Sequence, residues 1–274
     1  MDTPEPIITL LIVVVTAILS ARAFQDVRLR DRLLFSPYPI LAGREYYRLV
    51  TSAFIHADGR HLVFNMFSLY LFGHELEPFI GREHLLMIYF GSIIGGGLLS
   101  LFLHRHHDYR ALGASGGVCG IIFASVFLMP DGKITMLPLP VGIPAWLYAI
   151  LFLVAEYKGL RSAQSTIGHA THLGGAIAGL LVTTALYPYI VSWSPWLYAT
   201  VMGLSVAILF YSWINPLQLP LKSFLVMESN LPAKSPPPKP TDQEVDLILE
   251  KISAIGLHSL TEQERGILTR ASGK

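Results

Sequence analysis

The sequence predicts an all-α fold, a polytopic bundle of transmembrane helices followed by a small helical C-terminal tail. Composition is the first observation: of 274 residues, 52% are hydrophobic and only 14% are charged. That is too apolar for a soluble domain and too long for one or two anchors. The second is that apolar stretches of about 20 residues, which cross a hydrocarbon core about 30 Å thick, recur along the chain. A net charge of +1 gives no indication of nucleic-acid binding.

Seven apolar stretches are expected to be helical spans. The first begins with acidic residues only and lacks a small-residue cleavage site, so we expect a retained span and not a removed signal peptide. The first six form a helical core within residues 1–190, and residues 191–215 hold an additional segment, expected to be a seventh transmembrane helix. The stretches are Pro6–Phe24, His61–Ile80, His84–Leu103, Ala114–Met129, Leu137–Ala155, Thr171–Tyr187 and Trp196–Ile214.

Two segments outside the spans have distinct compositions. In residues 25–60, between the first two spans, Arg alternates with Leu, Phe and Tyr, which is typical of an amphipathic structure at the membrane interface. Residues 216–240 include Ser-Pro-Pro-Pro-Lys-Pro and are expected to be a stiff, proline-rich linker.

The tail, residues 241–274, is expected to contain two short helices. Capping-box patterns begin at Thr241 and Thr261, each with Glu three residues later. Apolar residues from Val245 to Ile255 recur at helical spacing, so the first helix has an apolar face. A hairpin with the second helix, the membrane domain or a partner protein would cover that face.

Polar side chains within the spans lie at helix starts. Such groups are costly in hydrocarbon and therefore indicate function. A chain that crosses at every stretch runs in the same direction in the second, fourth and sixth, so their starts share one face and one shallow depth. The groups are His61 and Asn65 in the second stretch, Ser115 in the fourth, and His169 and His172 in the sixth.

Small residues repeat at four-residue spacing in two of these stretches. Gly116 and Gly120 lie in the fourth, and Gly175 and Gly179 lie in the sixth. This pattern lets helix backbones approach closely in membranes. We therefore expect the fourth and sixth helices to touch and to bring Ser115 beside a histidine.

Serine and histidine together suggest nucleophilic catalysis. The Ser115 hydroxyl needs a base, and the neutral imidazole of His172, with an ordinary pKa of about 6.5, can take its proton. The tetrahedral intermediate needs donors for its oxyanion, which His61, the Asn65 amide and the Ser115 backbone N–H could provide. No Asp or Glu is expected as a third member of the site.

Two alternatives concern the histidines. His169 and His172 are three residues apart and could bind a metal. The sequence has no HExxH motif and no evident intramembrane acid beside them, so we expect His169 to bond to the neighbouring loop and expect no metal or cofactor. A short connector with three histidines, residues 104–108, is expected to be solvated, with metal binding as the alternative.

Three motifs resemble, in order, the signatures of the rhomboid intramembrane proteases, over about residues 6–187. They are His61-Leu-Val-Phe-Asn65, Gly113-Ala-Ser-Gly116 and His172-Leu-Gly-Gly-Ala-Ile-Ala-Gly179. The resemblance implies Ser115 as nucleophile, His172 as general base, and His61 with Asn65 in the oxyanion hole. His56 and Glu77 are similar to further family positions. The supporting residues are Gly113, Gly116, His169, Gly175, Gly179 and Arg48.

Two residues depart from the family pattern. Tyr47 precedes Arg48 where the family usually has Trp, and it keeps an amphipathic aromatic at the interface. Cys119 lies one turn after Ser115, where an aromatic ring often packs on the base histidine, and a thiol supplies no ring face. The linker and tail are similar to an extension of some bacterial rhomboids.

The resemblance implies a serine endopeptidase that hydrolyses transmembrane segments of membrane proteins through an acyl-enzyme, without a cofactor. Expected partners are the lipid bilayer, transmembrane substrates and a binder of the tail, and the expected location is the bacterial inner membrane. The alternative is a non-catalytic rhomboid-like binder or quality-control factor, a class that lacks the serine or the histidine. A transporter would instead place charged groups near the midplane.

Charge and resemblance disagree on orientation. Residues 25–60, 104–112 and 156–170, on the serine side, hold ten Lys and Arg, against Arg82 and Lys133 opposite. The positive-inside rule would place the site in the cytoplasm. Rhomboids generally open outward, and we adopt that orientation because the first loop is long and interfacial.

Overall fold

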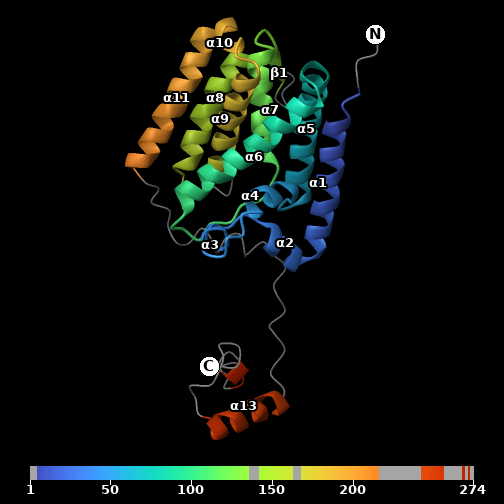
Figure 1. Ribbon diagram of the computed structural model, residues 1–274, viewed down its shortest axis with the longest axis vertical. Coiled ribbons are helices and arrows are strands. Elements are labelled where there is room, and N and C mark those ends of the chain that lie inside the picture. Colours follow the sequence, from blue (N-terminus) through green and yellow to red (C-terminus); the bar gives the residue numbers. More distant parts are fainter. Residues whose placement is uncertain are drawn as a thin grey trace. The chain divides into compact units, whose positions relative to one another are not determined.

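The computed structural model describes residues 5–135, 142–162, 168–215, 242–255, 267–268 and 271. The chain forms two compact units, Met1–Phe224 and Leu225–Lys274. The first unit is a bundle of helices that places the N-terminal ends of several helices side by side (Figure 1).

The long helices of the first unit correspond to the seven predicted stretches. Polar residues, proline and glycine separate them, as expected for helix ends. They are α1 Ile7–Gln25, α5 Gly59–Ile80, α6 Arg82–His104, α7 Ser115–Leu128, α8 Ala145–Leu160, α9 His169–Leu186 and α11 Pro195–Ile214. Shorter elements are α2 Val27–Leu33, α3 Pro37–Leu41, α4 Arg48–Thr51, η1 Ser52–Phe54, α10 Ile190–Trp193 and the antiparallel strands β1 Lys133–Thr135 and β2 Gly142–Pro144.

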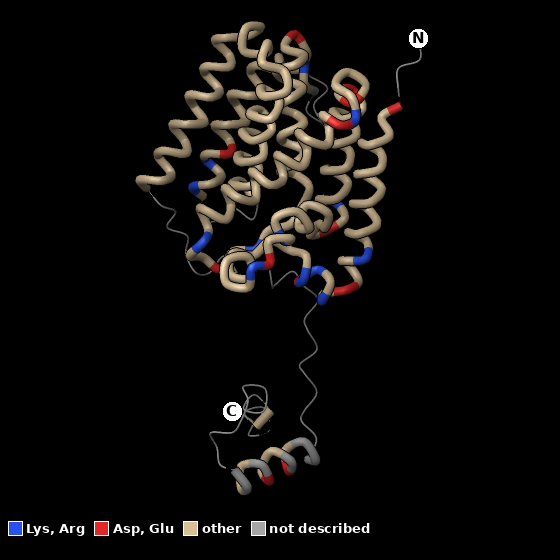
Figure 2. The backbone as a smooth tube through the Cα atoms, in the orientation of Figure 1, with Lys and Arg blue, Asp and Glu red and all other residues tan. Residues whose placement is uncertain are grey.

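The surface of the bundle suits a membrane. Within the described part of the chain, α1, α6 and α11 are long and apolar enough to cross a bilayer, and α7 is equally apolar but has 14 residues. Lys, Arg, Asp and Glu gather at the two ends of the bundle, and the band between is nearly free of them (Figure 2). Exposed Trp146, Trp193, Trp196 and Trp213 lie near helix ends, where interfacial tryptophans are enriched.

The fifth stretch is displaced from its predicted position. The prediction was Leu137–Ala155, but α8 begins at Ala145, immediately after strand β2, and continues to Leu160. Pro144 precedes the helix with extended backbone, and proline cannot donate the backbone hydrogen bond of a helix interior. The later end places Glu156 inside the helix.

The first loop is folded into short helices held by Arg48, whose side chain is buried. Its Nη1 donates to the carbonyls of Asp31 and Leu34, at 2.7 and 2.9 Å, and its Nε pairs with Glu45. The bond from Arg48 holds the pKa of Glu45 below its usual value. Arg48 therefore shapes the loop.

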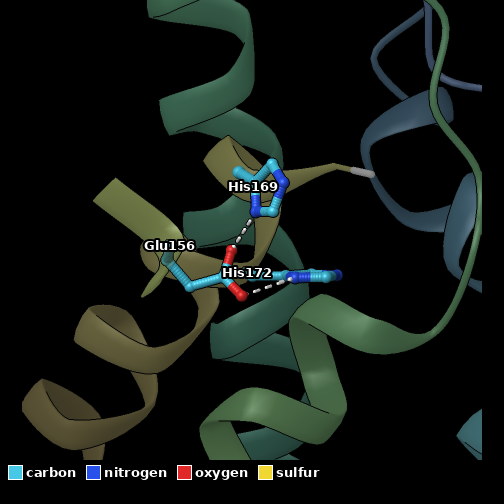
Figure 3. Close-up of side chains that lie close together, drawn as sticks. All are labelled: Glu156, His169 and His172. Atoms are coloured by element: carbon cyan, nitrogen blue, oxygen red, sulfur yellow. Dashed lines mark hydrogen bonds and ion pairs between the residues drawn. The ribbon is translucent and has the colours of Figure 1, made fainter. Parts of the chain in front are cut away.

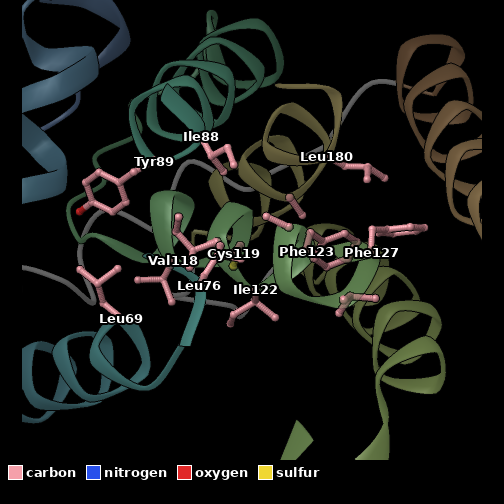
Figure 4. Close-up of a cluster of buried hydrophobic side chains, with 14 of the residues drawn as sticks. Leu69, Leu76, Ile88, Tyr89, Val118, Cys119, Ile122, Phe123, Phe127 and Leu180 are labelled. Atoms are coloured by element: carbon pink, nitrogen blue, oxygen red, sulfur yellow. The ribbon is translucent and has the colours of Figure 1, made fainter. Parts of the chain in front are cut away.

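Helix α7 is the centre of the bundle. Every residue from Gly116 to Leu128 is buried, and the helix packs against α6 and α9. Figure 4 shows its side chains meeting Leu69, Leu76, Ile88 and Leu180 of the surrounding helices. The hydrophobic core of the unit is thus built around the helix that begins at Ser115.

Glycines allow α7 and α9 to touch. A Cβ on Gly175 would lie 2.2 Å from the Gly116 carbonyl oxygen, and a Cβ on Gly179 would lie 2.4 Å from the Gly120 Cα. No side chain larger than hydrogen fits at such separations. The contact between these two helices is therefore one of backbone against backbone.

Buried Glu77 connects α5 to the start of α1. Its carboxylate accepts the backbone N–H groups of Ile8 and Thr9, at 2.9 and 2.7 Å, and the Thr9 hydroxyl. The first N–H groups of a helix have no partner within the helix, and a carboxylate there also favours the helix dipole.

Helix α11 ends beside the end of α8. Arg161, just after α8, donates to the Asn215 carbonyl that caps α11, at 2.9 Å, and the rings of Tyr157 and Tyr211 lie edge to face. The two helices therefore end on the same face of the bundle.

The second unit contains helix α13, Asp242–Ile255. Ile248 is buried and Leu249 is 49% exposed, so the predicted apolar face is partly covered. Of the helix predicted after Thr261, Ile267, Leu268 and Ala271 are described, and all three are helical. Thr241 and the linker of residues 216–240 lie outside the described residues.

We predict that Gly179→Ala lowers the free energy of unfolding by about 1–3 kcal/mol, the usual cost of overpacking a core. The added methyl group would meet the backbone of Gly120. Thermal unfolding in detergent measures the effect. Gly203→Ala is the matched control, because a Cβ there has no neighbour within 4 Å. Equal unfolding midpoints for the two variants would contradict the packing described here.

Asp58 caps α5, and its removal should be costly. Its carboxylate accepts the His61 N–H at 2.9 Å, and this bond holds the pKa of Asp58 below its usual value. We expect Asp58→Ala to lower the free energy of unfolding by about 1 kcal/mol at neutral pH.

Because the folded-state pKa of Asp58 is depressed, the carboxylate contribution is present at neutral pH and is lost as pH falls through that pKa. Unfolding curves of wild type and Asp58→Ala should therefore converge in acid. Asp58→Asn keeps an acceptor and is the control. A difference between wild type and Asp58→Ala that does not change with pH would contradict the assignment.

Candidate active site

Ser115 and His172 lie side by side at the start of their helices. Ser115 is the first residue of α7, and His172 is on the first turn of α9. The Ser115 Oγ is 2.7 Å from the His172 Nε2. Both side chains are half-buried, whereas the rest of α7 is buried, so the pair lies where the core meets the bundle's face.

The segment before Ser115 is held by the first loop. Phe35 and Ala111 exchange two backbone hydrogen bonds, and the Gly113 N–H donates to the Ser52 carbonyl. The Ala114 N–H donates to the His56 Nε2 at 3.2 Å. These bonds fix the backbone that delivers the hydroxyl.

Gly113 gives His61 its place. Its φ of +129° is a backbone conformation that favours glycine, and a Cβ there would lie 2.8 Å from the His61 Cε1. The His61 ring therefore packs on the backbone two residues before Ser115. The His56 ring meets the His61 ring edge to face, with the two ring centroids 4.9 Å apart.

Asn65 is buried on α5, one turn after His61. Its Nδ2 donates to the His61 carbonyl at 2.9 Å, a bond within the helix. The structure thus brings His61 close to the segment of Ser115, while the Asn65 amide is hydrogen-bonded along its own helix.

The sequence reasoning missed Glu156. Its carboxylate lies between two histidines of α9, as Figure 3 shows, with Oε2 2.6 Å from the His169 Nδ1 and Oε1 3.3 Å from the His172 Nδ1. The expectation that no acid stands beside His172 is therefore wrong. His169, expected to bond to the loop, bonds to Glu156.

The miss follows from the displaced end of α8. The predicted stretch ended at Ala155, which put Glu156 in a loop. Helix α8 runs opposite to α9, so its last turns arrive where α9 begins, and Glu156 lies on those turns. The odd-numbered spans end on the face where the even-numbered spans begin, so the end of the fifth span is expected near the start of the sixth. That relation indicates an acid near the histidines of α9.

The same three residues could hold a metal ion. One ligand atom from each of Glu156, His169 and His172 lies within 4.8 Å of the others. Two imidazoles and a carboxylate form a ligand set that zinc accepts. Both hydrogen bonds to Glu156 use the same atoms, so an ion would have to replace them.

The arrangement can activate an alcohol. An imidazole at hydrogen-bond distance from a serine hydroxyl can take its proton, and a carboxylate on the other ring nitrogen orients the imidazole. Backbone and His61 donors beside the serine could stabilise negative charge on an attacked carbonyl.

Two family profiles match the chain. The Rhomboid domain profile matches residues 43–189, and a family of unknown function, DUF6576, matches residues 239–274. "RHOMBOID-like protein 12, mitochondrial" of Arabidopsis thaliana is 31% identical over 57% of this chain and 50% of its own length.

Two bacterial relatives are named as proteases. "Rhomboid protease AarA" of Providencia stuartii is 30% identical over 58% of this chain and 63% of its own length. "Rhomboid protease GluP" of Bacillus subtilis is 28% identical over 54% of this chain and 27% of its own length. The match thus spans less than two thirds of each relative. Since the domain match covers more than half of its 274 residues, this chain is a multi-pass integral membrane protein of the rhomboid family.

Proposed function

We propose that this protein is an intramembrane serine endopeptidase that cleaves transmembrane segments of other membrane proteins. The observation that carries the proposal is the 2.7 Å separation of the Ser115 Oγ and the His172 Nε2. Membership of a family whose matched bacterial relatives are named proteases supports it. We assign the activity to residues 1–190.

The reaction proceeds through an acyl-enzyme. The His172 Nε2 takes the proton of the Ser115 hydroxyl while the oxygen attacks the substrate carbonyl. The protonated imidazole then gives that proton to the leaving amine, and the peptide bond breaks. A water molecule, activated by the same nitrogen, hydrolyses the ester.

His61, the Ser115 backbone N–H and the Asn65 amide are the proposed donors to the oxyanion. The packing of His61 on Gly113 supports its part. The Asn65 amide would have to exchange its bond within α5 for one to the substrate. Such donors act on charge that develops only as the carbonyl is attacked.

The bilayer and transmembrane substrates are the proposed partners, and the bacterial inner membrane is the proposed location. Bacterial relatives support this location, although a mitochondrial relative matches a similar share of the chain. A substrate helix must unwind to offer a carbonyl to Ser115, because helical carbonyls are already hydrogen-bonded.

We expect Ser115→Ala and His172→Ala each to lower kcat/KM by at least about 10³, the scale for losing a catalytic serine or its base. Cleavage of a single-span reporter by detergent-purified protein measures this. Thermal unfolding shows whether each variant is folded.

Activity that survives Ser115→Ala would refute the assignment of the nucleophile. Absence of cleavage by folded wild type, across reporters with different spans, would instead favour a non-catalytic binder of membrane helices. Labelling of Ser115 by a fluorophosphonate separates these cases, because it reports the nucleophile without a substrate helix.

His61→Ala should lower kcat by about 10²-fold, the usual effect of removing one oxyanion donor, with a much smaller change in KM. Steady-state cleavage of the same reporter measures both constants. His74→Ala, on an exposed position of the same helix, is the control. A rise in KM with unchanged kcat would show that His61 binds the substrate and not the transition state.

A further inference from the structure

We propose that Glu156 is a positioning residue for His172, so that Ser115, His172 and Glu156 work as a triad in which His169 holds the carboxylate. This rests on the proposed function, because it assigns a role in the same reaction. Cys119, one turn after Ser115, offers the base no ring face. The Glu156 carboxylate supplies the missing constraint through hydrogen bonds.

The geometry orders the three groups. The His172 ring has the Ser115 Oγ 2.7 Å from Nε2 and the Glu156 Oε1 3.3 Å from Nδ1. An ionised carboxylate only accepts hydrogen bonds, so it requires the proton on Nδ1. That tautomer leaves Nε2 free to accept the serine proton, which is the reactive state of the pair.

The contact also acts during the reaction. When the His172 Nε2 takes the Ser115 proton, the ring becomes positively charged beside the carboxylate, while the Nδ1 proton stays in place. The three side chains of the cluster are shielded, with 12–16% of each exposed, so this attraction is screened less than at a surface.

His169 fixes Glu156 in turn. The His169 Nδ1 lies 2.6 Å from the Glu156 Oε2, on the oxygen that His172 does not use. Residues three apart on a helix share a face, so α9 presents both rings to one carboxylate. A single glutamate on α8 thereby joins two residues on the first turn of α9, and the carboxylate is held by two donors.

The test compares Glu156→Gln with Glu156→Asp in the full-length protein. We expect Glu156→Gln to lower kcat by about 10²-fold with KM nearly unchanged, less than the ~10⁴ seen for a closely bonded triad aspartate, because the contact is long. Glu156→Asp keeps the charge and should recover at least half of that loss on a logarithmic scale. Glu75→Gln makes the same change at an exposed position and is the matched control.

Fluorophosphonate labelling of Ser115 gives a readout without a substrate helix. Its rate should fall in Glu156→Gln by a factor similar to that of kcat. Equal losses in the Gln and Asp variants would overturn the proposal, because the loss would follow shape and not charge. Should Glu156→Gln fail to fold, Glu156→Asp against wild type decides. A labelling rate lowered by about 10²-fold in Glu156→Asp overturns the proposal, because the retained charge should have recovered at least half of that loss.

The remaining outcomes are distinguishable. Wild-type kcat in Glu156→Gln, with Ser115→Ala and His172→Ala inactive, overturns the positioning role of Glu156 and leaves the proposed function standing. Activity in Ser115→Ala overturns the proposed function itself. Loss of wild-type activity in a chelator, restored by Zn²⁺, overturns the positioning role by showing that the cluster acts through an ion.

Discussion

The contact between Gly116 and Gly175 is the constraint on which the rest of this bundle depends. The room for a Cβ is missing on both sides, so α7 and α9 meet backbone to backbone. Their close packing sets the distance between the first turns of the two helices. Helix packing brings the hydroxyl of Ser115 and the imidazole of His172 beside one another. Because α7 is buried from Gly116 to Leu128, the surrounding close-packed core resists small shifts of this helix and maintains the distance between Ser115 and His172.

A second set of constraints reaches Ser115 from the first loop. Arg48 donates hydrogen bonds to two backbone carbonyls of the loop. The backbone of Phe35 in the loop pairs with that of Ala111, and His56 accepts the N–H of Ala114. Polar groups of the loop thereby form hydrogen bonds with the segment before Ser115. The loop thus supports the backbone at the start of α7.

Much of the fold could be predicted from sequence, because burying polar groups in hydrocarbon is costly. That cost sets the length of the apolar stretches and confines polar side chains to the starts of helices. Because alternate spans run in the same direction, Ser115 and His172 were expected on one face. The spacing of the glycines indicated which helices touch. The end of α8 could not be placed this way, since apolar residues on both sides of Pro144 gave one continuous stretch. That error of a few residues hid Glu156. The orientation of the Asn65 amide was also beyond reach, because it depends on a choice between partners of similar strength.

The position where α11 ends fixes the face of the bundle at which its last long helix finishes. Asn215 lies beside Arg161, on the face where α8 ends and α9 begins. Ser115 and His172 lie at the starts of α7 and α9, on that same face. Helix α11 therefore returns the chain to the end of the bundle that holds the candidate site.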